Sequence, residues 1–256
     1  MAFDPSKIRL YVEAALEGGA EVPLSPGQAH YLRAVMRRDI GAQLYLFNGR
    51  DGEWTATLSV LSKKAAAVLV NDKVRDQTQT PDLHLCFAPI KGARLDFVAQ
   101  KATEMGVSVI QPVLTERTIV RRIKTDRLMA NAMEAAEQCE CMAVPQVQEP
   151  LKLDSLLAGW PSDRTLVFCD EGGSRNPLEA LQSIGPETQK WGVLIGPEGG
   201  FSDAERARIL AGRNVLPITL GPRILRADTA AIAALSLVQA VLGDWEDAPR
   251  QARLKG

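Results

Sequence analysis

The chain has few of the residues that mark a secreted, metal-binding or membrane protein. Its 256 residues include four cysteines and two histidines, and no two cysteines have the C-x-x-C spacing of a structural zinc site. We therefore expect reduced thiols and no bound metal. The longest apolar segment, residues 230–242, is too short to span a bilayer, and the first residues lack the apolar core of a signal peptide. These absences predict a cytoplasmic protein with no membrane partner.

The chain also lacks an excess of charge of either sign. It has 30 Lys and Arg against 31 Asp and Glu, a net charge of −1. Domains that bind nucleic acid through their overall charge are usually basic, so any RNA contact must use a local patch. The hydrophobic content of 46% is ordinary for a globular protein and excludes a disordered chain.

Glycine and proline, by contrast, gather in two turns near the carboxyl end. The first turn follows the apolar residues 193–195 and has the sequence GPEGG, residues 196–200. A helical pattern then begins at Ser202, which has capping-box spacing to Glu205. Glycines allow positive φ and a close approach of the backbone to a ligand, and the helix start presents free N–H groups. The pattern predicts a strand, a ligand-binding turn and a helix.

A second strand pattern, residues 215–220, ends in the turn GPRILR at residues 221–226, and Asp228 then opens a nearly apolar helical segment. In open α/β sheets, turns that follow successive strands line one crevice at the carboxyl ends of those strands. The two turns are therefore predicted to form one site. The alternative is that both are ordinary turns between the layers of the fold.

The glycine pattern excludes two common nucleotide sites. GPEGGF lacks the Lys-Ser/Thr of a phosphate-binding loop, and it is not the G-x-G-x-x-G of a dinucleotide site. Glu198 in the turn would also repel phosphates. The turn therefore favours a cationic or zwitterionic ligand.

The rest of the chain predicts two domains. Residues 1–72 have the pattern of a small β-rich unit with one helix that begins at Ser25, and the polar residues 73–81 are the expected linker. From residue 82 onward strands alternate with helices, which is typical of a parallel sheet covered on both faces. Strands are expected at residues 8–12, 43–47, 53–60, 65–70, 83–88, 107–114, 165–170, 193–195 and 215–220, and helices at residues 93–105, 125–138 and 177–184.

Four parts of the sequence together resemble a known family. They are the pair LIGPEGGFSDAE and LGPRILRADTA, the segment KGARLDFVAQKATEMG at residues 91–106, EAAEQ at residues 134–138, and residues 30–52. They resemble the RsmE family of SPOUT-class methyltransferases, which methylate uridine N3 in small-subunit (16S) ribosomal RNA. The resemblance implies an α/β fold, with a PUA-like RNA-binding β-barrel at residues 1–72 and a trefoil-knotted parallel-sheet methyltransferase domain at residues 82–256. It also implies S-adenosylmethionine as cofactor, and 16S rRNA or the small ribosomal subunit as partner.

The resemblance implies a cofactor site built from three loops. Backbone groups there would bind the adenine edge, apolar side chains would cover its faces, and Glu198 would tolerate the positive sulfonium. The expected cofactor-binding residues are Asp170, Glu171, Ile195, Gly196, Pro197, Glu198, Gly199, Leu220, Gly221, Ile224 and Leu225. Gly199 is expected to have positive φ.

Methylation of uridine N3 requires removal of the imide proton or stabilisation of the anion. Asp228 is expected to be the base and Arg226 the anion stabiliser. The alternative is that the two side chains pair with each other or cap the last helix.

RNA contacts are expected from Arg9, His30, Arg33, Arg37 and Lys91. The alternative for the arginines is a solvated helix face. His30 could stack on a base or contribute only to packing.

The sequence departs from the family at two places. Arg226-Ala227-Asp228-Thr229-Ala230 stands where Arg-Thr-Glu-Thr-Ala is usual, and Cys139-Glu140-Cys141-Met142 stands where small residues and an arginine are usual. The second hypothesis is accordingly an RNA-binding or ribosome-associated protein on the same scaffold without catalysis. The intact GPEGG and GPRIL turns favour the enzyme.

Residues 230–242 are apolar on more than one face. A helix of this kind must be covered on all sides, which predicts a homodimer that pairs it with a two-fold copy. The alternative is burial within one chain.

Overall fold

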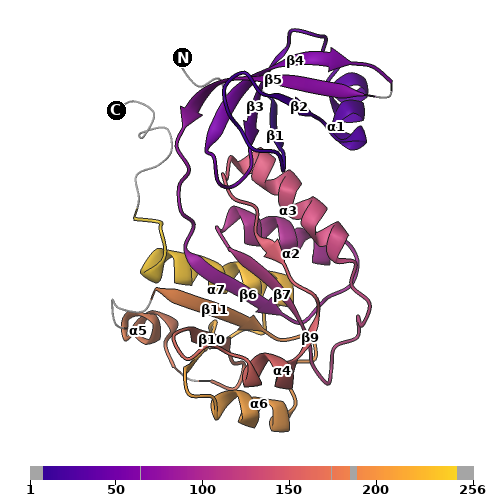
Figure 1. Ribbon diagram of the computed structural model, residues 1–256. Helices are drawn as coiled ribbons and strands as arrows, with labels where there is room; N and C mark the ends of the chain where they lie inside the picture. The colour runs from indigo at the N-terminus through magenta and orange to yellow at the C-terminus, as the bar shows by residue number, and fades with distance from the viewer. Residues whose placement is uncertain (1–7, 64, 174, 185–188, 247–256) are drawn as a thin grey trace. The chain divides into compact units, whose positions relative to one another are not determined.

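The computed structural model describes residues 8–63, 65–173, 175–184 and 189–246, and the chain divides into two compact units. The first unit contains the chain up to Gln79 together with Ala136–Ala143, and the second contains Thr80–Ala135 and the chain from Val144 onward. Figure 1 traces the course of the chain through the elements of each unit.

The first unit is a five-stranded sheet with the strand order β1-β3-β4-β5-β2. The β1–β3 pair is parallel, and the other pairs are antiparallel. Its strands are β1 (Ile8–Tyr11), β2 (Glu21–Pro23), β3 (Gln43–Phe47), β4 (Glu53–Leu61) and β5 (Ala66–Arg75). Alternation along the strands buries apolar side chains such as Leu44, Leu46 and Leu58 in one core.

The helix of the first unit begins as its sequence predicts. Ser25 caps α1 (Pro26–His30) by accepting a hydrogen bond from the Gln28 N–H, and Gln28 completes a capping box. The helix continues as one π-helical segment, η1 (Tyr31–Val35). Strand β5 runs to Arg75, so the first three residues of the expected linker 73–81 belong to this strand, and Lys73 and Arg75 pair with β4.

The buried side chain of Arg9 joins the two parts of the first unit. The Arg9 Nε atom donates to Glu53 Oε1 at 2.5 Å, and the two side chains are 3% and 1% exposed. Another Arg9 nitrogen donates to the Ala136 carbonyl at 2.7 Å, and a third to the Cys141 carbonyl at 3.2 Å. These bonds explain why Ala136–Ala143 belong to the first unit, although the sequence assigned them to the second domain.

The prediction that Arg9 contacts RNA is therefore wrong. The residue is 6% exposed, its guanidinium lies 4.2 Å from the centre of the Phe47 ring, and its donors are engaged inside the unit. Arg9 is a structural residue.

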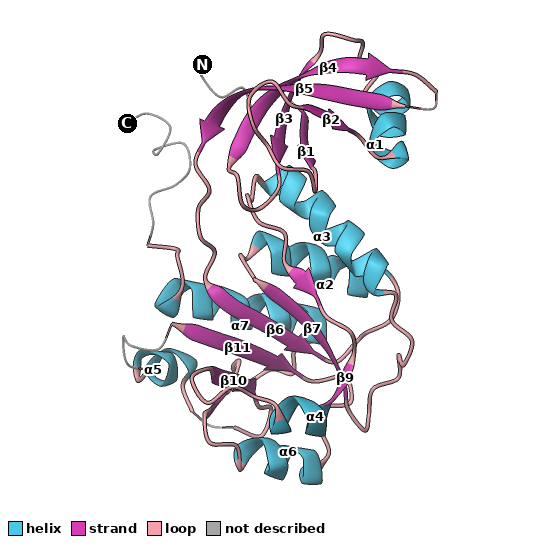
Figure 2. Ribbon diagram, viewed as in Figure 1, coloured by secondary structure: helices cyan, strands magenta, loops and turns pink. Residues whose placement is uncertain are grey.

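The second unit is a seven-stranded sheet in which every pair is parallel, as predicted (Figure 2). The strand order is β12-β10-β11-β6-β7-β8, with β9 paired to β7. The strands are β6 (Asp82–Phe87), β7 (Val109–Leu114), β8 (Gln146–Val147), β9 (Leu151–Lys152), β10 (Thr165–Cys169), β11 (Lys190–Ile195) and β12 (Val215–Ile218). The short strands β8 and β9 were not predicted.

Helices cover both faces of this sheet. On one face α2 (Ala93–Glu104), α5 (Pro177–Gln182) and α7 (Ala227–Leu242) share a core with the strands, together with Leu128 of α3 (Thr125–Cys139). On the other face α4 (Leu153–Ala158), which was not predicted, and α6 (Asp203–Leu210) pack on Leu166 and Phe168. The capping box predicted for α6 is confirmed, with Ser202 and Glu205 as its partners.

We predict that Arg9→Met lowers the free energy of unfolding of the protein by about 3 to 5 kcal/mol, because it leaves the buried Glu53 carboxylate without its closest partner. Arg33→Met is the matched control. Arg33 is exposed, so this change should stay within about 0.5 kcal/mol of the wild type. Urea denaturation followed by circular dichroism measures both, and equal losses in the two variants would contradict the structural role of Arg9.

Candidate functional site

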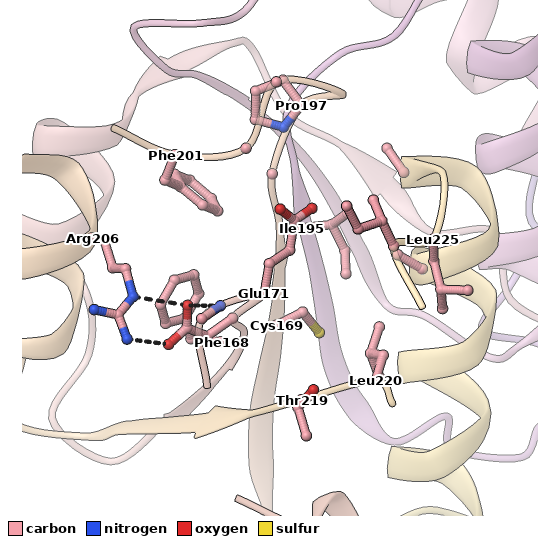
Figure 3. Close-up of a pocket in the computed structure, with 18 of the residues that line it drawn as sticks. Phe168, Cys169, Glu171, Ile195, Pro197, Phe201, Arg206, Thr219, Leu220 and Leu225 are labelled. Atoms are coloured by element: carbon pink, nitrogen blue, oxygen red, sulfur yellow. Dashed lines mark hydrogen bonds and ion pairs between the residues drawn. The ribbon is translucent and has the colours of Figure 1, made fainter. Parts of the chain in front are cut away.

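A cleft opens at the carboxyl ends of β10, β11 and β12, which are neighbours in the sheet. Its volume is about 450 Å³. The loops that follow these strands line it (Figure 3). Ala227 and Ala230, in the first turn of α7, also line it. Both glycine-proline turns therefore contribute to one cavity, at the position where open α/β sheets bind ligands.

Of the residues expected to bind a cofactor, all but Glu198 line this cleft. Glu198 is exposed, and its carboxylate lies 3.5 Å from a guanidinium nitrogen of Arg94. Glu171 instead provides a carboxylate in the cleft, beside Gly200 (Figure 3). Of the two glutamates, Glu171 therefore lines the cleft, whereas Glu198 pairs with Arg94 outside the lining.

A bidentate ion pair supports the loop that carries Glu171. Arg206 of α6 donates to the two carboxylate oxygens of Asp170 at 2.9 and 2.8 Å. Asp170 is 5% exposed and also accepts the Gly172 N–H at 3.1 Å. Its hydrogen bonds to Arg206 raise the pKa of that guanidinium. Asp170 thus holds the loop against α6, and paired in this way it contributes little net charge to the cleft.

An aromatic pair forms the apolar wall of the cleft. The rings of Phe168 and Phe201 are 5.4 Å apart and meet edge to face. A Cβ atom on Gly196 would lie 2.8 Å from the Phe201 ring, so only glycine allows this packing. Gly200 has a φ of +66°, whereas Gly199 is not among the residues with positive φ. The expectation of positive φ at Gly199 is therefore wrong, and the next residue, Gly200, has this conformation instead.

Three backbone N–H groups of the second turn have no hydrogen-bond acceptor among the residues that the structure describes. Within the described part of the chain, the N–H groups of Leu220, Ile224 and Leu225 donate to no backbone carbonyl. Apolar side chains, among them Ile195 and Leu225, stand beside them in the cleft (Figure 3). Free donors at an edge and apolar groups over the faces suit a flat heteroaromatic ligand.

The acid–base groups of the cleft lining are carboxylates, among them Glu171. Burial raises the pKa of Cys169, which lines the cleft, to about 12, so its thiol is protonated and is a poor nucleophile. No histidine is among the described residues of the lining. His84 lies elsewhere on β6, and burial lowers its pKa to about 4.

Arg226 and Asp228 are the sequence neighbours of Ala227, which lines the cleft. Arg226 occupies the position before α7 without a side-chain capping bond, and Asp228 accepts the Thr229 N–H at 3.0 Å. Ala227, between them, lines the cleft, whereas neither charged residue does. None of the ion pairs in the described part of the chain engages either residue. The alternative in which Arg226 and Asp228 pair with each other therefore has no support. Of the two side chains, only Asp228 bonds a backbone N–H in the first turn of α7.

The remaining residues expected to contact RNA are all exposed. His30, Arg33 and Arg37 lie on or just after the helical segment of the first unit, and Lys91 precedes α2 in the second. The sequence did not indicate Arg117, Phe168, Phe201 or Arg206, which also line the cleft. Of these, Phe201 could have been found because it directly follows GPEGG.

Across the residues that the structure describes, no three His, Cys, Asp or Glu side chains gather as a metal site. Within the same ranges, no helix has the length and apolar character needed to cross a membrane.

Two family models match this chain. One describes an RNA methyltransferase domain and matches residues 77–239, and the other describes an RNA methyltransferase PUA domain and matches residues 24–71. Among similar proteins, the ribosomal RNA small subunit methyltransferase E of Synechocystis sp. is 33% identical over 87% of this chain and 74% of its own length. The protein of the same name from Rickettsia conorii is 28% identical over 90% of this chain and 94% of its own.

Two similar solved structures contain a bound ligand. The ribosomal RNA small subunit methyltransferase E from Neisseria gonorrhoeae, bound to S-adenosylmethionine, has a TM-score of 0.84 at 30% identity and covers 93% of this chain and 99% of its own. A putative methyltransferase from Legionella pneumophila, in complex with the same cofactor, has a TM-score of 0.85 at 33% identity with the same coverage.

Proposed function

This chain belongs to the RNA methyltransferase family that includes the ribosomal RNA small subunit methyltransferase E proteins, and we propose that it transfers a methyl group from S-adenosylmethionine to uridine N3 of small-subunit rRNA. The observation that carries this proposal is the cleft at the ends of β10, β11 and β12, lined by both glycine-proline turns. Relatives of similar fold bind this cofactor. A cytoplasmic location and the trefoil knot remain predictions.

The lining of the cleft fits S-adenosylmethionine, which supplies an activated methyl group. The free N–H groups of Leu220, Ile224 and Leu225 would donate to the adenine edge, and neighbouring apolar side chains would cover its faces. The Glu171 carboxylate provides the negative charge that a sulfonium favours. The chain's main contributions to transfer are positioning of the reactants and exclusion of water.

The two charged neighbours of Ala227 are proposed to activate the uracil. We propose that Asp228 removes the imide proton from N3 and that Arg226 stabilises the resulting anion. The carboxylate and the guanidinium flank Ala227, which itself lines the cleft. Cys169 is protonated and no histidine is in the described lining, which supports Asp228 as the proposed base on the side of α7.

The first unit is proposed to hold the RNA. Its match to a methyltransferase PUA domain includes His30, Arg33 and Arg37, all of them exposed. Exposed guanidinium groups suit contacts to phosphates, which position an RNA without specifying its sequence. Lys91 would add a contact from the second unit.

A homodimer is proposed as the working unit. Helix α7 contacts α2, α5 and β11 of its own chain, so burial within one chain accounts for part of its apolar surface. Leu237 and Val241 pack against that core. Ile232 is only partly buried and is not among the residues packed there, which leaves it for a partner.

The function is tested by comparing ribosomal RNA from cells with and without this protein. We expect one N3-methylated uridine of the small subunit to be lost without the protein and restored by the wild-type gene. Mass spectrometry of nuclease fragments locates it. An unchanged set of methylated nucleosides, with cofactor and RNA binding retained, would instead support the RNA-binding protein without catalysis.

We predict that Gly196→Ala weakens binding of S-adenosylmethionine about tenfold or more, a loss of roughly 1.4 kcal/mol or more. The added methyl group would displace the Phe201 ring from the cleft wall. Gly199→Ala is the matched control, because its Cβ would meet Arg117 only at an ordinary 3.6 Å. Titration calorimetry compares the two, and equal affinities would contradict the role given to Gly196.

We predict that Asp228→Asn slows single-turnover methylation about a hundredfold or more while cofactor affinity stays near that of the wild type. The amide keeps the shape of the side chain but cannot take the imide proton at neutral pH. Asp228→Glu should retain much of the rate. A wild-type rate for the amide variant would remove Asp228 as the base, and loss of cofactor binding would favour a capping role.

We predict that Ile232→Glu converts a dimer to a folded monomer with little activity, because a charge would be buried in the interface. Leu178→Glu, on the 47% exposed Leu178 of α5, is the control and should remain dimeric. Sedimentation velocity measures both. A wild-type protein that sediments as a fully active monomer would show that the second copy is not needed.

A further inference from the structure

Two cysteines outside the cleft lie close together. Cys139 ends α3, Cys141 follows it by two residues, and their sulfur atoms are 3.3 Å apart. Cys139 is exposed and Cys141 is partly exposed. The proposed methyl transfer uses neither thiol, and the pair stands at one of the two places where the sequence departs from the family it resembles.

The backbone brings the two thiols together. Side chains two residues apart point away from each other on a helix and are well separated along a strand. Glu140, between the cysteines, has a φ of 63°, a left-handed conformation that non-glycine residues seldom adopt. This bend turns Cys141 back toward Cys139.

Two arginines of the first unit hold the bend. Arg75 donates to the Glu140 carbonyl at 3.0 Å, and Arg9 donates to the Cys141 carbonyl at 3.2 Å. Arg9 is itself fixed by its buried contact with Glu53. The uncommon conformation of Glu140 therefore rests on contacts within the unit, and the two thiols are kept adjacent in the folded protein.

We propose that Cys139 and Cys141 form a reversible intramolecular disulfide with small-molecule disulfides, such as oxidised glutathione, as the oxidant. The Cys139 thiolate attacks one sulfur of glutathione disulfide, which releases one glutathione thiolate and leaves a mixed disulfide on Cys139. The Cys141 thiolate then attacks the Cys139 sulfur and displaces the second glutathione. The two cysteines lose two electrons and two protons, and the oxidant becomes two thiols.

The starting geometry suits this exchange. A disulfide bond is about 2.05 Å long, so the two sulfur atoms need to approach by only a little over an ångström from their present 3.3 Å. The other two cysteines are poor competitors, because burial raises the pKa of Cys86 and of Cys169 to about 12. The oxidant should therefore act on the exposed pair.

The test uses the full-length reduced protein in a series of oxidised and reduced glutathione mixtures. After acid quenching, free thiols are alkylated and the protein is digested with trypsin, which leaves Cys139 and Cys141 together on the peptide of residues 128–152, apart from the other cysteines. We expect this peptide to lose two hydrogen atoms and both alkylation sites as the oxidised fraction rises, and dithiothreitol to reverse the change. The peptides of Cys86 and Cys169 serve as internal controls and should remain alkylated.

Single substitutions separate the two steps. Cys141→Ser should stop at a glutathione adduct on Cys139, and Cys139→Ser should form no intramolecular bond, with circular dichroism showing that both variants fold. Full alkylation of both wild-type cysteines in excess oxidised glutathione would overturn the proposal. So would disulfide-linked dimers as the sole product, or thiol protection that a chelator abolishes, which would indicate a bound metal.

Discussion

Parallel pairing of β10 with both β11 and β12 is the constraint on which the site depends. Val167 stands opposite Val193 on one side and Leu216 on the other, so the three strands end at nearly the same level. Each chain segment must leave the sheet at that edge and cross a face before the next strand begins. The loops carrying Glu171, Gly196 and Leu220 are thereby gathered around one cleft, and the Thr219 N–H donates to the Arg175 carbonyl at 3.3 Å between the loops after β12 and β10.

The same residues shape the cleft and the core beneath it. Gly196 admits the Phe201 ring, and the ring of Phe201 packs on Phe168, which belongs to the core under α6. Gly192, farther down β11, lies against the Trp160 ring, where an added Cβ atom would be 2.6 Å or less from the ring. Because neither glycine has a side chain, aromatic rings can approach the backbone of β11 and of the turn that follows it. Substitutions at the cleft should therefore be judged for stability as well as for ligand affinity.

Sequence patterns predicted those features that depend on near neighbours. The alternation of strands and helices predicted the parallel sheet, and the spacing of Ser202 and Glu205 predicted the start of α6. Strands of two residues, such as β8 and β9, are too short to show a period. Which acid of the loops faces the cleft depends on backbone angles, and this explains why Glu198 was favoured over Glu171. The burial of Arg9 depends on Glu53, 44 residues away, and no local pattern contains that contact.

The burial of Arg9 in an ion pair also explains why the net charge of the chain says little about RNA binding. Arg9, Arg164 and Arg206 are occupied by the carboxylates of Glu53, Asp82 and Asp170, so each pair cancels in the sum and presents little field to a distant phosphate. Exposed arginines such as Arg33 and Arg37 keep their charge near the surface. The attraction between a protein and RNA depends on the charges that reach phosphates and release counterions. A total near zero is therefore compatible with a local RNA-binding patch, because the charges that set the total and those that bind RNA are largely different residues.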